Sequence, residues 1–281
     1  MKLQLFFIFS LCTPLISFSA SAKGSLCDKT HRQSNSIKNM VSMLDYYNGP
    51  VKSVITSSQL PHEGRFKAFK GEAQFDECGS LMLYDFSTQE YIHEHIETNL
   101  LRMSVPYDMK FKYQLKNRHR THTLYLHTLY HENAQNQLTH KVSNFYDEHG
   151  KLMGSETSQF SYSDNKITSE TVIKSDTENL GNTIYFHYDK QDRLLKTVEN
   201  NEITLEFNYG SDGKVLHQTQ LFSSLYDDIR EYDQTCREWD KYNNCLTWDL
   251  ISTIKQNGEL IDTSKATIYN RFEYYEEVNL N

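Results

Sequence analysis

The chain has 281 residues, with 29 Lys and Arg against 37 Asp and Glu, and a net charge of −8 at pH 7. This acidic balance excludes nucleic acid and an anionic membrane surface as main partners, because both require a basic protein face. With 19 Tyr and 15 Phe, the composition predicts a folded, β-rich chain rather than a disordered one.

Residues 1–22 have the pattern of a secretory signal peptide. Lys2 precedes an apolar run, and Ala20-Ser21-Ala22 forms a small-x-small cleavage site. Pro14 interrupts the run, which is too short for the ~20 apolar residues that span a bilayer. We expect cleavage near Ala22, no transmembrane segment, and a periplasmic or secreted protein. Leu26 stands directly before Cys27, where a lipoprotein signal needs a small residue, which argues against a lipid anchor.

The remaining residues, 23–281, show no linker-like run and predict a single β-rich domain. It begins with a helix at about 34–47, since Ile37, Met40, Val41 and Leu44 share one helical face. The segment 48–50, Asn-Gly-Pro, ends this helix.

Strand-like segments follow over about 51–275. Residues 109–115 alternate strictly between apolar and polar types, which is typical of a strand with one buried face. Most connections are too short for a crossover helix, so neighbouring strands should be antiparallel. The fold class is therefore mainly β: an antiparallel meander of roughly ten to fourteen strands forming a large twisted sheet or partial barrel.

A short degenerate phrase marks several of the expected turns: an aromatic, Asp (or Ser or Gly), a polar pair, Gly (or Asn or Asp), a basic residue (Ser80 in the first copy) and an aliphatic. Asp can accept turn amides, and Gly, Asn or Asp can adopt the positive φ that tight hairpins need. The phrase resembles the tyrosine–aspartate repeat of Rhs-type proteins, but its spacing drifts, so we expect no strict solenoid. The four copies are at 75–81, 146–152, 188–194 and 209–215.

Four cysteines remain after cleavage, and an even number in an exported protein predicts disulfides. Cys236 and Cys245 flank an expected turn, so the favoured pairing is Cys236–Cys245 with Cys27–Cys78. The other two pairings stay open. A four-cysteine zinc site is disfavoured because no C-x-x-C spacing occurs.

Several landmarks together resemble the YnfC-type family of enterobacterial envelope lipoproteins. They are Gly49-Pro50-Val51-Lys52, Cys78, the late cysteine pair, and the closing segment Tyr269-Asn270-Arg271-Phe272-Glu273-Tyr274-Tyr275. The resemblance implies an exported envelope protein and brings no catalytic residue. This chain departs from the family by lacking a convincing lipid-attachment site.

Three sets of side chains are weak candidates for chemistry. Asp227-Asp228 and Glu276-Glu277 offer paired carboxylates for glycan hydrolysis. Histidines on one strand face could bind zinc or copper, but exposed polar positions explain them more simply. Aromatic residues around the late cysteine pair could stack on a glycan or protein, although a core role is favoured. The histidines are His119, His122, His127 and His131, and the aromatics are Trp239, Tyr242 and Trp248.

No catalytic motif accompanies the repeated turns and strands, and no cofactor is implied. The sequence favours a non-enzymatic interaction or structural module whose partner is another envelope protein. Two alternatives stay open: an envelope glycan hydrolase using acidic residues, and a histidine-rich metal-binding protein.

Overall fold

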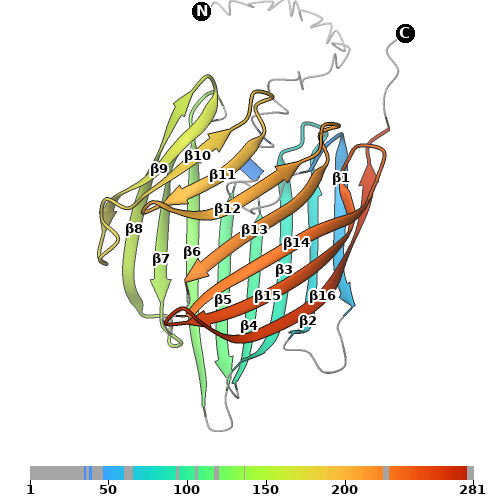
Figure 1. The fold of residues 1–281 in the computed structure, drawn as a ribbon. Coiled ribbons are helices and arrows are strands. Elements are labelled where there is room, and N and C mark those ends of the chain that lie inside the picture. The colour runs from blue at the N-terminus through green and yellow to red at the C-terminus, as the bar shows by residue number, and fades with distance from the viewer. Residues whose placement is uncertain are drawn as a thin grey trace, which may run out of the picture.

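The described residues form sixteen antiparallel strands that close into one barrel in the computed structural model (Figure 1). Each strand pairs with its neighbours in sequence, and β1 closes the barrel by pairing with β16. Within the described residues, no helix has the length and apolar character needed to cross a membrane. The structure describes residues 35, 38–39, 47–59, 66–92, 95–104, 107–116, 120–135, 137–223 and 228–276. The strands are β1 (Val51–Gln59), β2 (Phe66–Phe75), β3 (Leu81–Ile92), β4 (His95–Ser104), β5 (Asp108–Lys116), β6 (Thr121–Glu132), β7 (Leu138–Tyr146), β8 (Leu152–Ser163), β9 (Lys166–Ser175), β10 (Thr183–Tyr188), β11 (Leu194–Glu199), β12 (Glu202–Tyr209), β13 (Val215–Ser223), β14 (Asp228–Trp239), β15 (Cys245–Gln256) and β16 (Glu259–Tyr274).

The mainly-β, antiparallel prediction is confirmed, but the closure is complete rather than partial. The described residues contain sixteen strands, so the predicted number of roughly ten to fourteen was too low. Strand β14 has a polar inward face, with Arg230 and Gln234 on the side of the buried Cys236, so it lacks the expected apolar alternation. Because polar residues of β14 face the barrel interior, its sequence does not show the apolar alternation that predicts a strand.

The predicted N-terminal helix lies mostly outside the described residues. Asn35, Lys38 and Asn39 are described and have helical backbone conformation, while Ile37, Met40, Val41 and Leu44 are not described. The helix at 34–47 therefore stays a prediction. Residues 1–22 and Cys27 also lie outside the described part.

The ends of the barrel differ, and we name them by their turns. The closed end carries the turns at 76–80, 189–193, 210–214 and 240–244, and lies uppermost in Figure 1. The open end carries the opposite connections, at 147–151, 176–182, 200–201 and 257–258. The largest cluster of buried apolar residues lies toward the closed end, where strands begin with a buried aliphatic side chain. These first or second residues are Leu81, Leu138, Ile167, Leu194 and Val215.

The recurrent phrase forms the hairpin turn that its residues predict. The Asp189 carboxylate accepts hydrogen bonds from the amides of Gln191 and Arg193, at 2.8 and 2.9 Å. Asp192 then adopts a φ of 63°. The same pair of accepted amides occurs at Asp76 and Asp147, and also at Asp240, in a copy that sequence analysis missed.

Copies at the closed end also bind one another. The first aromatic residue of one copy donates a hydrogen bond to a backbone carbonyl of the copy before it. That carbonyl belongs to the aliphatic residue that directly follows the basic residue of the earlier copy. That basic side chain lies over the same aromatic ring, as Arg193 does at 4.3 Å from the centre of the Tyr209 ring. This arrangement repeats in space although the sequence spacing drifts. The hydrogen bonds are Tyr188–Ile167 at 2.9 Å, Tyr209–Leu194 at 2.8 Å and Trp239–Val215 at 3.0 Å.

Candidate functional site

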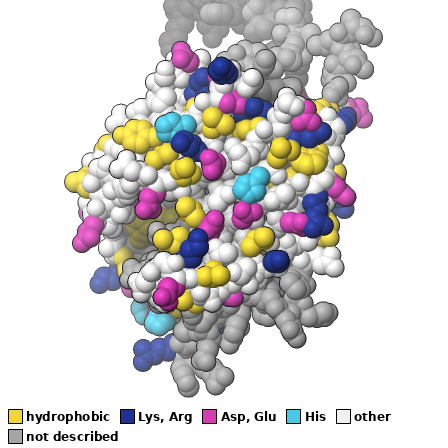
Figure 2. Space-filling view, in the orientation of Figure 1, with side chains coloured by type: hydrophobic (Ala, Val, Ile, Leu, Met, Phe, Trp, Pro, Cys, Tyr) yellow, Lys and Arg dark blue, Asp and Glu magenta, His cyan; other side chains and the backbone are white. Residues whose placement is uncertain are grey.

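The barrel interior contains a cavity of about 790 Å³. It reaches Met153 and Thr177 near the open end, and Figure 2 shows a hollow with hydrophobic side chains inside it. Gly71 makes room on one wall, because a Cβ there would lie 2.8 Å from the Phe86 ring. Apolar side chains dominate the lining, among them Phe86, Leu101, Phe111, Leu126, Trp248 and Ile268.

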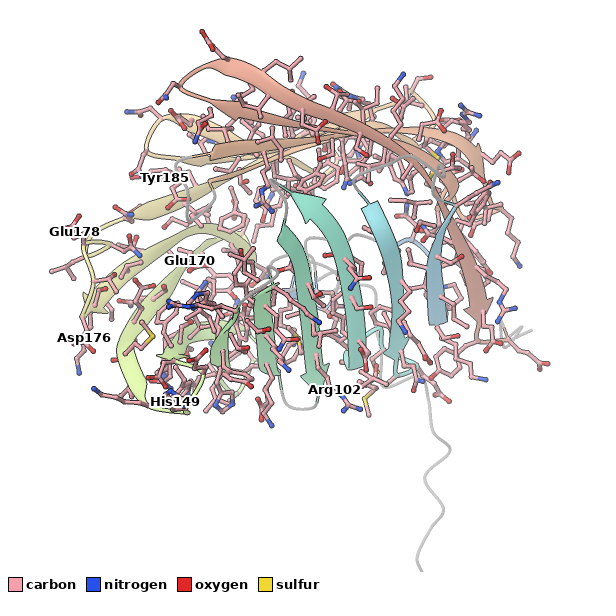
Figure 3. All side chains as sticks on the ribbon, turned by 90° about the horizontal axis from the view of Figure 1, so that it is seen from below. Arg102, His149, Glu170, Asp176, Glu178 and Tyr185 are labelled. Atoms are coloured by element: carbon pink, nitrogen blue, oxygen red, sulfur yellow. A yellow bond between two sulfur atoms is a disulfide. The ribbon has the colours of Figure 1, made fainter. Side chains whose placement is uncertain are left out.

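The cavity has an apolar wall and a polar wall. Strands β4, β5 and β6 contribute Leu101, Phe111 and Leu126, which are direct cross-strand neighbours. On the other side, β13 contributes Gln218 and Gln220, and β14 contributes further polar groups. Figure 3 shows side chains in the space between the layer containing β13–β16 and the layer containing the early strands. The cavity is therefore amphipathic.

A polar contact crosses the interior beside the cavity. The Tyr232 hydroxyl on β14 donates to the Glu90 carboxylate on β3 at 3.2 Å, although these strands are not neighbours in the sheet. Glu90 and Arg230 are both buried and both line the cavity. A small apolar cluster also joins the layers here, because Phe69 of β2 packs with Leu250 and its neighbours. The two layers thus contact each other around the cavity.

A second charged group lies in the interior, outside the cavity lining. The ammonium of Lys141 lies 2.5 Å from the Glu170 carboxylate, and Figure 3 labels Glu170 between the two layers. Burial by itself lowers the pKa of Lys141, but the Glu170 carboxylate raises it above its ordinary value. Burial, with Glu170 nearby, raises the pKa of the Glu199 carboxyl. Lys141 therefore holds its proton beside Glu170, and Glu199 also holds its proton more readily than an ordinary glutamate.

The structure separates the candidate histidines. The His127 ring nitrogen lies 2.8 Å from the Asp108 carboxylate, and His131 stacks on His140 with ring centres 4.2 Å apart. His122 is exposed, and His119 lies outside the described residues. Among the residues that the structure describes, no three His, Cys, Asp or Glu side chains form a group that could hold a metal.

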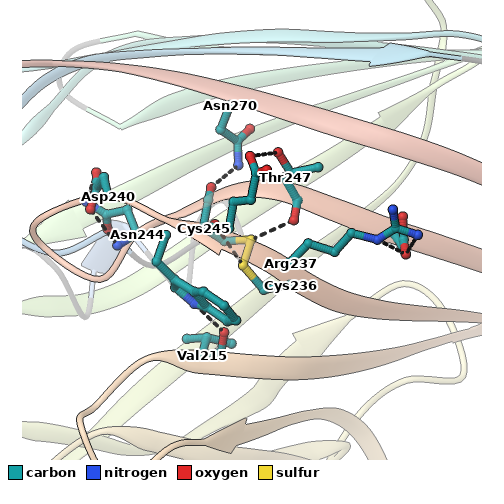
Figure 4. Close-up of a disulfide and its surroundings, with 11 residues drawn as sticks. Val215, Cys236, Arg237, Asp240, Asn244, Cys245, Thr247 and Asn270 are labelled. Carbon is teal, nitrogen blue, oxygen red and sulfur yellow. Dashed lines mark hydrogen bonds and ion pairs between the residues drawn. A yellow bond between two sulfur atoms is a disulfide. The ribbon is translucent and has the colours of Figure 1, made fainter.

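The predicted Cys236–Cys245 disulfide is confirmed, with Cα atoms 5.9 Å apart (Figure 4). It joins β14 to β15 next to the 240–244 turn at the closed end. Cys78 is also disulfide-bonded, and its partner lies outside the described residues. The Cys27–Cys78 pairing therefore remains a prediction.

The three candidate binding aromatics have different positions. Trp248 lines the cavity. Trp239 belongs to the hydrogen-bonded series at the closed end, and Tyr242 packs on Tyr274 with ring centres 4.5 Å apart. The carboxylate pairs are only partly visible, because Asp227 and Glu277 lie outside the described residues.

Sequence analysis missed most of the cavity. Gln218, Gln220, Arg230 and Tyr232 were not predicted to share a site. The available signal was a strand at 215–221 with two glutamines two positions apart, which places both on one face. That signal does not show whether the shared face points inward.

Neither the family models nor the curated proteins include a match to this chain. Among solved structures, a porin-like protein from Bacteroides uniformis matches with a TM-score of 0.33 and 8% identity, over 81% of this chain and 98% of that chain. A β-barrel-like protein of the domain of unknown function DUF1849, from Brucella abortus, matches with a TM-score of 0.25 and 8% identity, over 82% and 100%. Both TM-scores lie below 0.5, so neither likeness carries a conclusion about this chain.

Proposed function

We propose that this chain is an exported, non-enzymatic binding protein that holds an apolar or amphipathic small molecule inside its barrel. The observation that carries the proposal is the cavity of about 790 Å³, lined mainly by aromatic and aliphatic side chains. Cavities of roughly 300–1,000 Å³ with apolar linings and a few polar groups are typical ligand sites.

The distribution of side chains supports a barrel that works in water. Most of the cavity lining is apolar, whereas Asp85, Arg102 and Glu206 are exposed on the outer surface. Figure 2 shows charged side chains interspersed over that surface. Barrels that span membranes have the opposite arrangement, and a basic side chain on their lipid face costs about 2–4 kcal/mol at the midplane.

The sequence supports an envelope location for this binding function. Residues 1–22 have a signal-peptide pattern, and disulfides persist mainly in oxidising compartments. The resemblance to YnfC-type proteins is consistent with the periplasm. Its expected partner, another envelope protein, would then donate or accept the bound molecule.

The two alternative functions have less support. Glu199 has the raised pKa expected of a general acid. However, Glu170 is engaged by Lys141, and neither carboxyl lines the cavity. For the histidine hypothesis, the described histidines do not converge on one point.

The proposal is tested with the uncharged dye N-phenyl-1-naphthylamine, whose fluorescence rises in apolar surroundings. We expect the mature protein to bind the dye, and Leu101→Trp combined with Leu126→Trp to weaken binding about tenfold or more by filling the cavity. The matched control is Leu100→Trp with Leu129→Trp, which places the same rings at exposed positions of the same strands. Absence of dye binding, or equal loss in both double variants, would overturn the proposal.

A further inference from the structure

Three glutamine side chains line the cavity on the wall formed by β13 and β14. We propose that the ligand is an uncharged amphiphile, whose hydrogen-bonding end lies against Gln218, Gln220 and Gln234. Its apolar part would lie against β4–β6. This inference rests on the proposed function and assigns its ligand class.

The three glutamines form one patch because of the strand register. Gln218 lies directly opposite Gln234, and Gln220 lies opposite Tyr232 on the same pair of strands. All of these side chains line the cavity, and Gln218 is only 7% exposed. The patch is therefore built by adjacent residues of two paired strands.

The glutamine amides are available to a ligand. Each carboxamide provides two N–H donors and a carbonyl acceptor. Within the described part of the chain, no hydrogen bond engages the side chains of Gln218, Gln220 or Gln234. Buried amides are normally hydrogen-bonded, because their transfer from water is otherwise costly. A ligand with hydroxyl, ester or amide groups matches both the donors and the acceptors.

The charges of the cavity favour an uncharged polar end. Among the described lining residues, Arg230 is cationic, while Glu72 and Glu90 are anionic. The lining therefore has no excess of positive charge with which to bind a carboxylate or phosphate. Burial of such an anion costs several kcal/mol unless a counter-charge compensates it. An uncharged polar group avoids that cost.

Competition against bound N-phenyl-1-naphthylamine separates the ligand classes. Three probes with matched chains are monooleoylglycerol, oleate and oleylamine, measured at pH 8 below their aggregation concentrations. We expect monooleoylglycerol to compete about tenfold more strongly than either charged probe.

Variants then locate the polar end. We expect Gln218→Met combined with Gln234→Met to weaken monooleoylglycerol binding about tenfold, because hydrogen bonds are lost while side-chain shape is kept. Gln159→Met, at an exposed position on β8, is the matched control.

The outcomes are distinguishable. If the dye binds but oleate or oleylamine competes as well as monooleoylglycerol, the inference is overturned and the proposed function stands. The inference also fails if the double methionine variant binds monooleoylglycerol as tightly as the unchanged protein does. Absence of dye binding overturns both.

Discussion

The two ends of the barrel use similar hairpins to different effect. At the closed end, aliphatic side chains such as Ile167 and Leu194 are buried beneath turns that hydrogen-bond to one another. Toward the open end the interior is hollow, and Met153, Leu180 and Leu260 are each more than 60% exposed. The comparison teaches that a meander can concentrate its packing at one end and leave the volume of a binding site at the other.

The largest expected effect on stability comes from shortening an interior side chain to Ala at each end of the barrel. Ile167 is fully buried at the closed end, so Ile167→Ala should lower the free energy of unfolding by about 2–5 kcal/mol. Leu126 lines the cavity and already lacks packing partners on that side, so Leu126→Ala should cost less than half as much. Urea unfolding measures both values. Equal losses would show that the cavity end is packed as tightly as the closed end.

A smaller loss of stability is expected when the Asp of a turn is replaced by Ala at each end of the barrel. Asp189 accepts two turn amides and forms an ion pair with Arg193, and both side chains are largely buried. Asp189→Ala should therefore destabilise the protein by about 1–2 kcal/mol. Asp147 accepts two amides in an exposed turn at the open end, so Asp147→Ala should have a smaller effect. The comparison fails if the two variants shift the urea midpoint equally.

The smallest expected effect is a pH dependence from Glu199. Its pKa in the folded protein lies above the ordinary value of 4.5, because burial and the nearby Glu170 disfavour the charged form. The folded state therefore binds this proton more tightly, and stability falls as pH rises from 4.5 through the folded pKa.

Glu199→Gln removes this penalty. We expect its melting temperature to exceed that of the unchanged protein at pH 8, with the difference shrinking toward pH 4. Glu202→Gln, at the exposed position across the 200–201 turn, is the control. A difference that does not vary with pH would contradict the role of Glu199.

The hairpins could be predicted from the sequence because their determinants are local. The Asp and positive-φ positions of the turn phrase specify the connection, and Cys236 and Cys245 flank one such turn. Closure could not be predicted, since β1 meets β16 only after all the intervening strands have added their twist.

The polar wall was hidden for a related reason. Which face of β13 points inward depends on barrel closure and on local register shifts, such as the one between Asn208 and Tyr209. Arg230 and Gln234 also made β14 resemble an exposed segment. Polar residues that face the cavity thus interrupt the alternation of apolar and polar residues from which a strand is predicted.

Pairing between β1 and β16 has a topological consequence. The backbone amide of Tyr275 donates to the carbonyl of Pro50 at 2.9 Å, so the two boundaries of the barrel domain lie side by side. In the part of the chain that the structure describes, every other strand pairing joins neighbours in sequence. The strands therefore form a closed ring in which every pair of neighbours is joined by a turn or loop, except β16 and β1. A connection could be placed between β16 and β1 as it is between any other pair of neighbours. The order of strands could therefore be rotated along the gene, by circular permutation, without changing a single pair.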